Sequence, residues 1–305
     1  MSAEAYNSMK KKNNSGYLSS IEYGGGKVGV LLFHSLGGTP MELKFLAQGI
    51  ARQGYTVSCP LLPGMANGTD VLSLSRWQDW YAEAEKAFDE LKSKCDTVLV
   101  GGLSAGSILA VRLAQQRPNE VGGLLAFAPT LWPNGWAIPW YFSFYRLVTQ
   151  RWFARMFRFK LRDPHGIKDD RVRNFMIEAF KGTGPGIEQI YARSGVMVLE
   201  FHRLVRAVIR NLGSCTAPAM IIHPRHDDQS DLSNTMILQK RLGGYVETVV
   251  LEDSYHMVTL DRQRDVVMER AVDFLRRMLE KREQQRVRAG SGLNNADAVQ
   301  AGAAE

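Results

Sequence analysis

Short apolar runs alternate with amphipathic helix patterns along most of this 305-residue chain, and this alternation limits the fold more than any other feature. In the first half, strands are predicted at 27–34, 55–60, 96–102 and 121–129, with helices at 39–54, 75–94 and 104–118. The pattern resumes with a strand at 217–224, a helix around 231–242, a strand at 245–252 and a helix around 262–281. Strict alternation predicts an α/β fold, with helices on both faces of a mostly parallel central sheet.

The ends and the middle of the chain depart from this pattern. Residues 1–16 are mostly polar and lack an apolar core, so we expect a flexible N-terminus rather than a secretory signal. Residues 282–305 lack aromatic side chains, which predicts a disordered tail. The α/β core is expected at 17–130 and 217–281. The insertion between its halves, 131–216, is expected to form a helical cap over one end of the sheet.

Composition narrows the classes of function. The formal net charge of +7 permits an anionic partner, but no zinc-ligand spacing, RNP motif or basic zipper is present, so nucleic acid is not an expected partner. Three scattered cysteines are too few for a disulfide framework or a metal site, which favours a reducing, cytoplasmic location. No histidines and carboxylates have metal-ligand spacing, so we expect no metal, and no apolar run is long enough to span a membrane.

A Gly-x-Ser-x-Gly motif lies where a predicted strand meets a predicted helix, with Ser104 between Gly102 and Gly106. Serine is a favoured helix N-cap, so a purely structural role is one interpretation. The other is a nucleophile, because a sharp strand-to-helix turn exposes the hydroxyl and tolerates only small flanking residues. Ligands of open α/β sheets bind at the carboxyl ends of the strands, which is where this serine lies.

A serine hydroxyl needs a base and a group that orients the base. Asp227 and Asp228 follow the strand at 217–224, and His256 follows the strand at 245–252. The order serine, acid, histidine, each in a loop after its own strand, predicts a catalytic triad. The structural alternatives are a turn-forming aspartate and a surface histidine, and the choice between Asp227 and Asp228 stays open.

An acyl-transfer site also needs two N–H donors for the developing oxyanion. The residue after the nucleophile, Ala105, supplies one at the start of a helix. The loop after the first main strand, "HSLGGTP", is expected to supply the other from Leu36.

Four segments of the chain resemble the bacterial carboxylesterases and monoacylglycerol lipases of the α/β-hydrolase fold: "VLLFHSLGGTPMELKFLAQGIARQGYTV", "GLSAG", "APAMIIHPRHDD" and "DSYHMVTLD". The resemblance runs from about Val28 to Leu279. It implies hydrolysis of a small-molecule ester or lipid with an apolar acyl chain, and no cofactor. Matched by position, the family's triad falls on Ser104, Asp227 and His256, and its oxyanion donors on Leu36 and Ala105.

Two positions differ from the family's usual pattern. Ser35 follows His34 where the family usually has glycine, and Met65 stands where the family often has a histidine. A serine has a Cβ atom, so the first difference predicts a changed backbone in the loop that carries Leu36.

The stretch 132–162 is dense in aromatic residues and arginines, and 146–173 contains nine basic and three acidic residues. One interpretation is a cap that packs its aromatic side chains on the core. The other is a segment that lies on an anionic membrane, which would make the protein peripheral to that membrane. Rival functions are a thioesterase, acyltransferase or C–C hydrolase on the same triad, or a non-catalytic lipid-binding or scaffold protein.

Overall fold

The computed structural model describes residues 19–65, 75–160, 162–181 and 192–301, so the N-terminal segment 1–16 lies outside the described residues. A seven-stranded sheet has the order β1-β3-β2-β4-β5-β8-β9, and its strands are parallel except for β1, which pairs antiparallel with β3. The strands are β1 (Ile21–Tyr23), β2 (Val28–Phe33), β3 (Thr56–Cys59), β4 (Thr97–Leu103), β5 (Val121–Phe127), β8 (Ala219–Pro224) and β9 (Val246–Leu251). The predicted α/β fold is confirmed.

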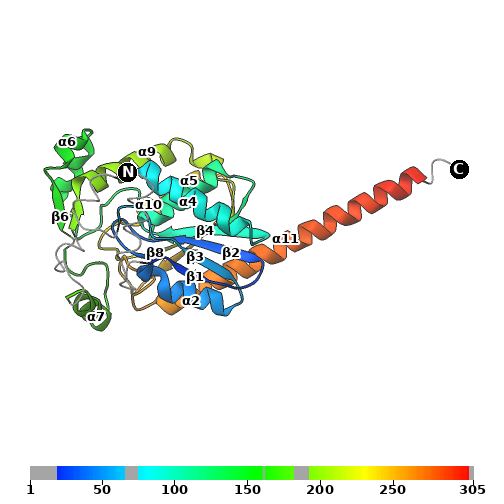
Figure 1. The fold of residues 1–305 in the computed structure, drawn as a ribbon, viewed down its shortest axis with the longest axis horizontal. Coiled ribbons are helices and arrows are strands. Elements are labelled where there is room, and N and C mark those ends of the chain that lie inside the picture. The colour runs from blue at the N-terminus through cyan, green and yellow to red at the C-terminus, as the bar shows by residue number, and fades with distance from the viewer. Residues whose placement is uncertain (1–18, 66–74, 161, 182–191, 302–305) are drawn as a thin grey trace.

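Helices cover both faces of this sheet (Figure 1). One face carries α4 (Trp77–Lys92), α5 (Ala105–Gln116), α9 (Gly195–Ile209) and α10 (Ser233–Arg241), and the other carries α2 (Lys44–Arg52) and α11 (Arg264–Ala301). Alternate side chains of a strand point to opposite faces, so Leu31 and Phe33 of β2 pack in the first layer, while Val30 and Leu32 pack in the second. Strands buried on both faces explain the continuous apolar runs in the sequence.

Parallel pairing brings the functional loops to one edge of the sheet. Phe33 of β2 pairs with Gly102 of β4, and Leu103 of β4 pairs with Phe127 of β5. Further along the sheet, Pro224 of β8 pairs with Leu251 of β9. The loops that follow all five strands therefore begin at the same carboxyl edge, where open α/β sheets bind ligands.

The sequence pattern predicted a helical insertion, but the structure shows that the insertion is not wholly helical. It contains a two-stranded antiparallel sheet in which Arg158 of β6 pairs with Ser194 of β7. Such short strands, separated by about thirty residues, leave no local periodicity in the sequence. The other elements between β5 and β8 are η2 (Trp140–Leu147), α6 (Arg151–Ala154), β6 (Arg158–Lys160), α7 (Asp170–Lys181), β7 (Ala192–Ser194), α9 and η3 (Leu212–Ser214). Helix α9 packs on α4 and α5 and so forms part of the helical layer over the sheet.

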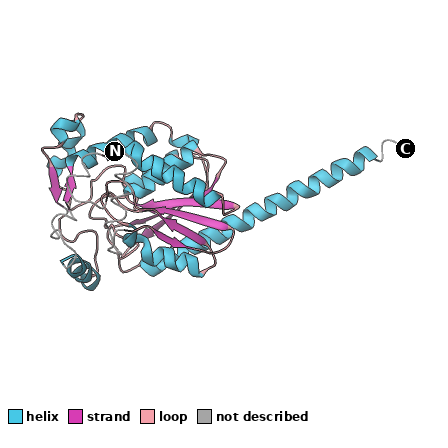
Figure 2. Cartoon of the chain, in the orientation of Figure 1, coloured by secondary structure: helices cyan, strands magenta, loops and turns pink. Residues whose placement is uncertain are grey.

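The closing helix α11 continues to Ala301, past the predicted helix end at 281 and into the segment predicted to be a disordered tail. Figures 1 and 2 show it as one long helix whose C-terminal part extends away from the other elements. No proline interrupts 282–301, and several residues of high helix propensity, namely Arg, Glu, Gln and Ala, occur there. Within the described residues, no helix is both long and apolar enough to cross a membrane.

Candidate active site

Ser104 occupies a strained backbone position between β4 and α5, with φ 57° and ψ −116°. A non-glycine residue in such a conformation typically costs about 1–3 kcal/mol. The turn is tight enough that a Cβ atom on Gly102 would lie 2.5 Å from the carbonyl oxygen of Phe33, and one on Gly106 only 2.1 Å from the same atom. Although Ser104 stands at the N-cap position, its side chain accepts no capping hydrogen bond, so the interpretation as a simple N-cap is wrong.

His256 and Asp227 form a buried hydrogen-bonded pair at the ends of β9 and β8. The imidazole Nδ1 lies 2.8 Å from Oδ2 and 3.0 Å from Oδ1 of Asp227. The carboxylate is held in turn by the backbone N–H groups of Gln229 and Ser230, both at 2.8 Å from Oδ1. These bonds fix the orientation of the imidazole ring.

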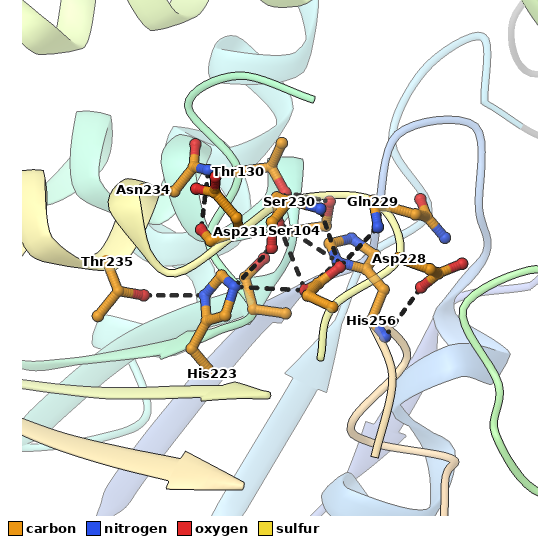
Figure 3. Close-up of polar contacts among 12 residues, drawn as sticks. Ser104, Thr130, His223, Asp228, Gln229, Ser230, Asp231, Asn234, Thr235 and His256 are labelled. Atoms are coloured by element: carbon orange, nitrogen blue, oxygen red, sulfur yellow. Dashed lines mark hydrogen bonds and ion pairs between the residues drawn. The ribbon is translucent and has the colours of Figure 1, made fainter. Parts of the chain in front are cut away.

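The neighbouring Asp228 contacts the backbone of the histidine rather than its ring. Its Oδ1 accepts the backbone N–H of His256 at 3.3 Å (Figure 3). Its Oδ2 accepts the N–H of Gly166 at 2.9 Å. Of the two candidate acids, Asp227 is therefore the one in contact with the imidazole.

Burial and nearby charges shift the pKa values of Asp227 and His256 in opposite directions. Burial favours neutral forms, but the charge of His256 and hydrogen bonds from His223 and His256 hold the pKa of Asp227 below its ordinary value. Burial also opposes protonation of His256, yet the nearby Asp227 carboxylate raises the pKa of that imidazole. Burial raises the pKa of Asp228 to about 6. The pair is thus a carboxylate beside an imidazole of increased basicity.

The Ser104 hydroxyl contacts a chain of hydroxyl groups that sequence analysis missed. Its Oγ lies 3.2 Å from Thr130 Oγ1, which donates to Ser230 Oγ at 3.0 Å (Figure 3). Ser230 Oγ lies 3.5 Å from both Asp227 Oδ2 and His256 Nδ1. The hydrogen bonds of the described residues link the Ser104 hydroxyl to Thr130 and not to the imidazole of His256, so the two groups must come into contact before the proton can transfer. The available signal for Thr130 was its position directly after the strand predicted at 121–129.

A second histidine, His223, lies on the far side of Asp227. Its Nδ1 is 2.8 Å from the hydroxyl of Thr235, and its Nε2 is 2.8 Å from the carbonyl oxygen of Ser230 and 3.3 Å from Asp227 Oδ2 (Figure 3). The carbonyl oxygen can only accept, so Nε2 carries a proton, and in the neutral tautomer the Thr235 hydroxyl donates to Nδ1. This proton faces Asp227, which makes His223 a positioning residue for the carboxylate.

The two residues expected to supply the oxyanion donors line the same cavity as Ser104. Leu36 follows β2, and Ala105 is the first residue of α5. Within the described residues, neither backbone N–H donates a hydrogen bond to another protein group. Two N–H groups without a protein acceptor in the wall of this cavity can stabilise the negative charge that develops on the oxygen of a bound carbonyl group.

Both departures from the family pattern contact the loop that carries Leu36. Ser35 donates its N–H and its hydroxyl to the carboxylate of Glu42, each at 3.0 Å. The N–H of Gly37 donates to the thioether of Met65 at 3.1 Å. The loop is thus held on both sides of Leu36. Sequence analysis missed Glu42, because its contact with Ser35 depends on how the loop turns and no sequence motif marks it.

Ser104, His256 and Leu36 line one cavity of about 630 Å³. The insertion supplies much of its wall through apolar side chains. These include Ile138, Phe142, Phe157, Phe159, Ile167, Val198 and Phe201. No cluster of three or more metal-ligating side chains occurs in the described part of the chain. The cavity thus offers an apolar compartment beside Ser104 and His256.

The sequence matches the family model "Alpha/beta hydrolase family" over residues 30–270. It is 27% identical over 259 residues to a thermostable monoacylglycerol lipase of Bacillus sp. (strain H-257), covering 82% of this chain and 90% of the relative. It is 22% identical over 263 residues to a carboxylesterase of Bacillus subtilis (strain 168), covering 83% and 94%. A solved structure from work on the metagenome-derived lipolytic enzymes LipS and LipT aligns with a TM-score of 0.68 and 25% identity, covering 86% and 98%. This chain belongs to the alpha/beta hydrolase family.

Proposed function

We propose that this protein is a serine hydrolase that cleaves carboxylic esters with an apolar acyl chain. The observation that carries the proposal is the buried Asp227–His256 pair, because its histidine lines the same cavity as the strained Ser104. The lipase and carboxylesterase relatives support an ester or lipid substrate. The apolar wall of the cavity supports an apolar acyl group.

In the proposed reaction, His256 takes the proton of Ser104 as Oγ bonds to the ester carbonyl carbon. The carbonyl electron pair moves onto oxygen, which the N–H groups of Leu36 and Ala105 stabilise. The tetrahedral intermediate then expels the alcohol, and His256 protonates it. Water, deprotonated by the same imidazole, releases the acid and restores Ser104. Asp227 keeps the imidazole in place and stabilises its charged form.

Hydrolysis of p-nitrophenyl esters of increasing acyl length tests this proposal. Wild-type protein should turn over at least one ester, and Ser104→Ala should fall to the background rate. The preferred acyl length would report the depth of the cavity. Ser107→Ala is a matched control, because Ser107 is also buried in α5 but bonds the backbone oxygens of Gly102 and Phe127. If wild-type protein hydrolyses none of the esters, the proposal is wrong.

A thioesterase, an acyltransferase or a C–C hydrolase would use the same acyl-enzyme, so the bond and the acceptor distinguish these rivals. Assays with matched oxygen and thioester substrates, and with added alcohol acceptors, compare them directly. A scaffold protein would not react with a fluorophosphonate probe, whereas the proposed hydrolase should be labelled at Ser104.

We also propose that the insertion touches an anionic membrane. Trp140, Leu147, Trp152 and Met156 expose 78%, 79%, 67% and 73% of their surfaces. Residues 131–162 contain six Arg and Lys residues and no Asp or Glu. An exposed aromatic surface flanked by positive charge is typical of segments that bind anionic lipid. Other aromatic side chains of the stretch, including Phe142 and Tyr145, are buried as the packing interpretation predicts.

Flotation with vesicles tests the membrane proposal. Binding to vesicles that contain phosphatidylglycerol should be strong at low salt and weak on neutral vesicles. A Trp140→Ser/Trp152→Ser variant should bind less, while Trp80→Phe, a change within the buried core, should not alter binding. Absence of binding to anionic vesicles at low salt would rule the contact out.

A further inference from the structure

A short segment of the insertion lies directly against the loop that carries His256. We call the segment 166–169 the strap and the stretch 255–261 the histidine loop. A Cβ atom on Gly166 would lie 3.3 Å from Cβ of His256 and 2.8 Å from Cγ of Met257, and the φ of Gly166 is 81°, a value that favours glycine. The backbone N–H of Met257 donates to the carbonyl oxygen of Gly166 at 2.8 Å. The strap therefore packs on the backbone that carries the proposed base.

The carboxylate of Asp261 joins the strap to the histidine loop. Its Oδ1 accepts the backbone N–H of Asp169 at 2.9 Å. Its Oδ2 accepts the N–H of Lys168 at 2.9 Å and the N–H of Tyr255, which directly precedes the base, at 2.6 Å. The side chain is buried, and hydrogen bonds to an ionised acceptor are stronger than those between neutral groups. Asp228, described above, bridges the same two segments, so two carboxylates hold the strap against the loop.

The strap is also connected to the wall of the catalytic cavity. Ile167, in the middle of the strap, is buried and lines the cavity. The side chain of Asp169 accepts the backbone N–H groups of Arg171 and Val172 at 2.9 and 3.1 Å and so caps the first turn of α7. Met176 of this helix lines the cavity as well. The strap thus joins apolar wall residues on one side to the histidine loop on the other.

These contacts link the cavity wall to the position of the base. An acyl chain in the cavity would lie against Ile167 and Met176. For proton transfer, His256 must come within hydrogen-bond distance of the Ser104 hydroxyl. A misplacement of about 1 Å caused by a distant mutation can lower the rate by ~10²-fold. A side chain that holds the strap and the histidine loop together can therefore affect the reaction without touching the substrate.

We propose that Asp261 is a positioning residue for His256, and that through it an acyl chain bound against the strap holds the base in its reactive place. This inference rests on the proposed ester hydrolysis and specifies how that site uses the acyl chain. Asp261 does not line the cavity, so it acts through the backbone of the strap and of the histidine loop. The acyl chain then contributes to kcat as well as to substrate binding.

Steady-state kinetics with p-nitrophenyl acetate and p-nitrophenyl octanoate tests the proposal. Asp261→Ala should lower kcat by about tenfold for the acetate and by ~10²-fold for the octanoate, because only the longer chain reaches the strap. KM for the octanoate should change less than kcat, since the apolar wall is kept. Labelling to completion with a fluorophosphonate counts the reactive sites. Expressing kcat per labelled site removes any loss that comes from unfolded protein.

Two further variants separate positioning from simple removal of charge. Asp261→Asn keeps one oxygen that can accept the N–H groups of Lys168 and Tyr255, so it should retain most of the wild-type kcat. Asp253→Asn is the matched control, because Asp253 lies 2.6 Å from Nζ of Lys168 and also joins the strap to the segment after β9, but through an exposed ion pair. It should change kcat by no more than about twofold.

A double-mutant cycle tests the route through the strap. Ile167→Ala shortens the strap's apolar contact with the acyl chain and should lower the octanoate-to-acetate ratio of kcat by about threefold. In the Asp261→Ala background the same change should have no further effect on this ratio, because the link to the base is already broken. If Asp261→Ala does not fold, the cycle is made with Asp261→Asn, in which the effect of Ile167→Ala should be reduced.

Three results would overturn the proposal. The first is an equal loss of kcat per labelled site for both esters in Asp261→Ala, and the second is a loss no greater than that in Asp253→Asn. The third is additivity of the two changes in the cycle. Each of these leaves the proposed hydrolase intact, provided that wild-type protein cleaves the esters and Ser104→Ala does not. Failure of wild-type protein to cleave either ester would reject the proposed function as well.

Discussion

The carboxyl edge of the sheet and the insertion that covers it are built in opposite ways. At the sheet edge, Asp227 and His256 are buried and held by multiple hydrogen bonds within the chain. In the insertion, Trp140 and Trp152 expose most of their surfaces and pack on other exposed aromatic rings. The first arrangement fixes atoms for chemistry, whereas the second leaves surface for contacts outside the protein. Reaction type and substrate choice should therefore respond to different mutations.

The largest effect on kcat should come from replacing Asp227, and replacing its neighbour Asp228 provides the comparison. Asp227→Asn should lower kcat by ~10⁴-fold, because the imidazole loses the acceptor that fixes its tautomer and its charged form. Asp228→Asn should cost far less, since Asp228 contacts backbone N–H groups. Steady-state kinetics on a p-nitrophenyl ester measures both. Equal losses in the two variants would contradict the assignment of Asp227 to the triad.

Loosening the loop that carries Leu36 should have the next largest effect. Glu42→Ala removes both hydrogen bonds to Ser35 and should lower kcat by up to ~10²-fold, the loss expected when one oxyanion donor is misplaced. Ser35→Gly keeps the backbone N–H bond to Glu42 and should lose less. If Glu42→Ala changes KM but not kcat, the loop does not hold an oxyanion donor.

The pH dependence of kcat/KM should change when the contact between His223 and Asp227 is removed. Because the base must be neutral, kcat/KM should fall on the acid side, at a pH above the ordinary pKa of histidine, since Asp227 raises the pKa of His256. His223→Phe removes a donor to Asp227, so its carboxylate should hold the imidazolium more strongly. The acid limb should then move to higher pH and lower kcat/KM there by about 2–10-fold, the range for one hydrogen bond.

Thr235→Val keeps the His223 ring and removes only the hydroxyl that contacts its Nδ1. It should shift the acid limb in the same direction by a smaller amount. A limb that does not move in either variant would show that His223 only fills space. Circular dichroism of both variants would separate a shifted profile from loss of fold.

The smallest effect is expected on the free energy of unfolding, from replacing an exposed aromatic residue of the insertion. Trp140→Ser should change the free energy of unfolding by no more than about 0.5 kcal/mol, whereas Phe142→Ala should cost about 3–5 kcal/mol because Phe142 is buried beside Tyr145 and Phe159. Urea unfolding measures both. A large loss of stability in Trp140→Ser would show that this tryptophan is a packing residue.

Much of the sheet and the order of the candidate site could be predicted because both depend on short-range patterns. Apolar runs such as 27–34 and 217–224 mark buried strands, and each candidate group follows its own strand. Parallel strands then bring their carboxyl ends to one edge whatever the details of packing. The sequence alone therefore predicted that Ser104, the two aspartates and His256 follow strands that end at the same edge of the sheet.

Only the tertiary structure distinguished features that share one local pattern. Asp227 and Asp228 are adjacent in sequence, but one carboxylate contacts the imidazole ring and the other the backbone. The Thr130–Ser230 hydroxyl contact and the pairing of Arg193 with Phe159 join residues far apart in the chain. The same holds for the aromatic stretch 132–162, where packing buries some rings and leaves others exposed. The local periodicity of apolar residues predicts where strands and helices lie, whereas side-chain contacts across the fold depend on how distant segments pack.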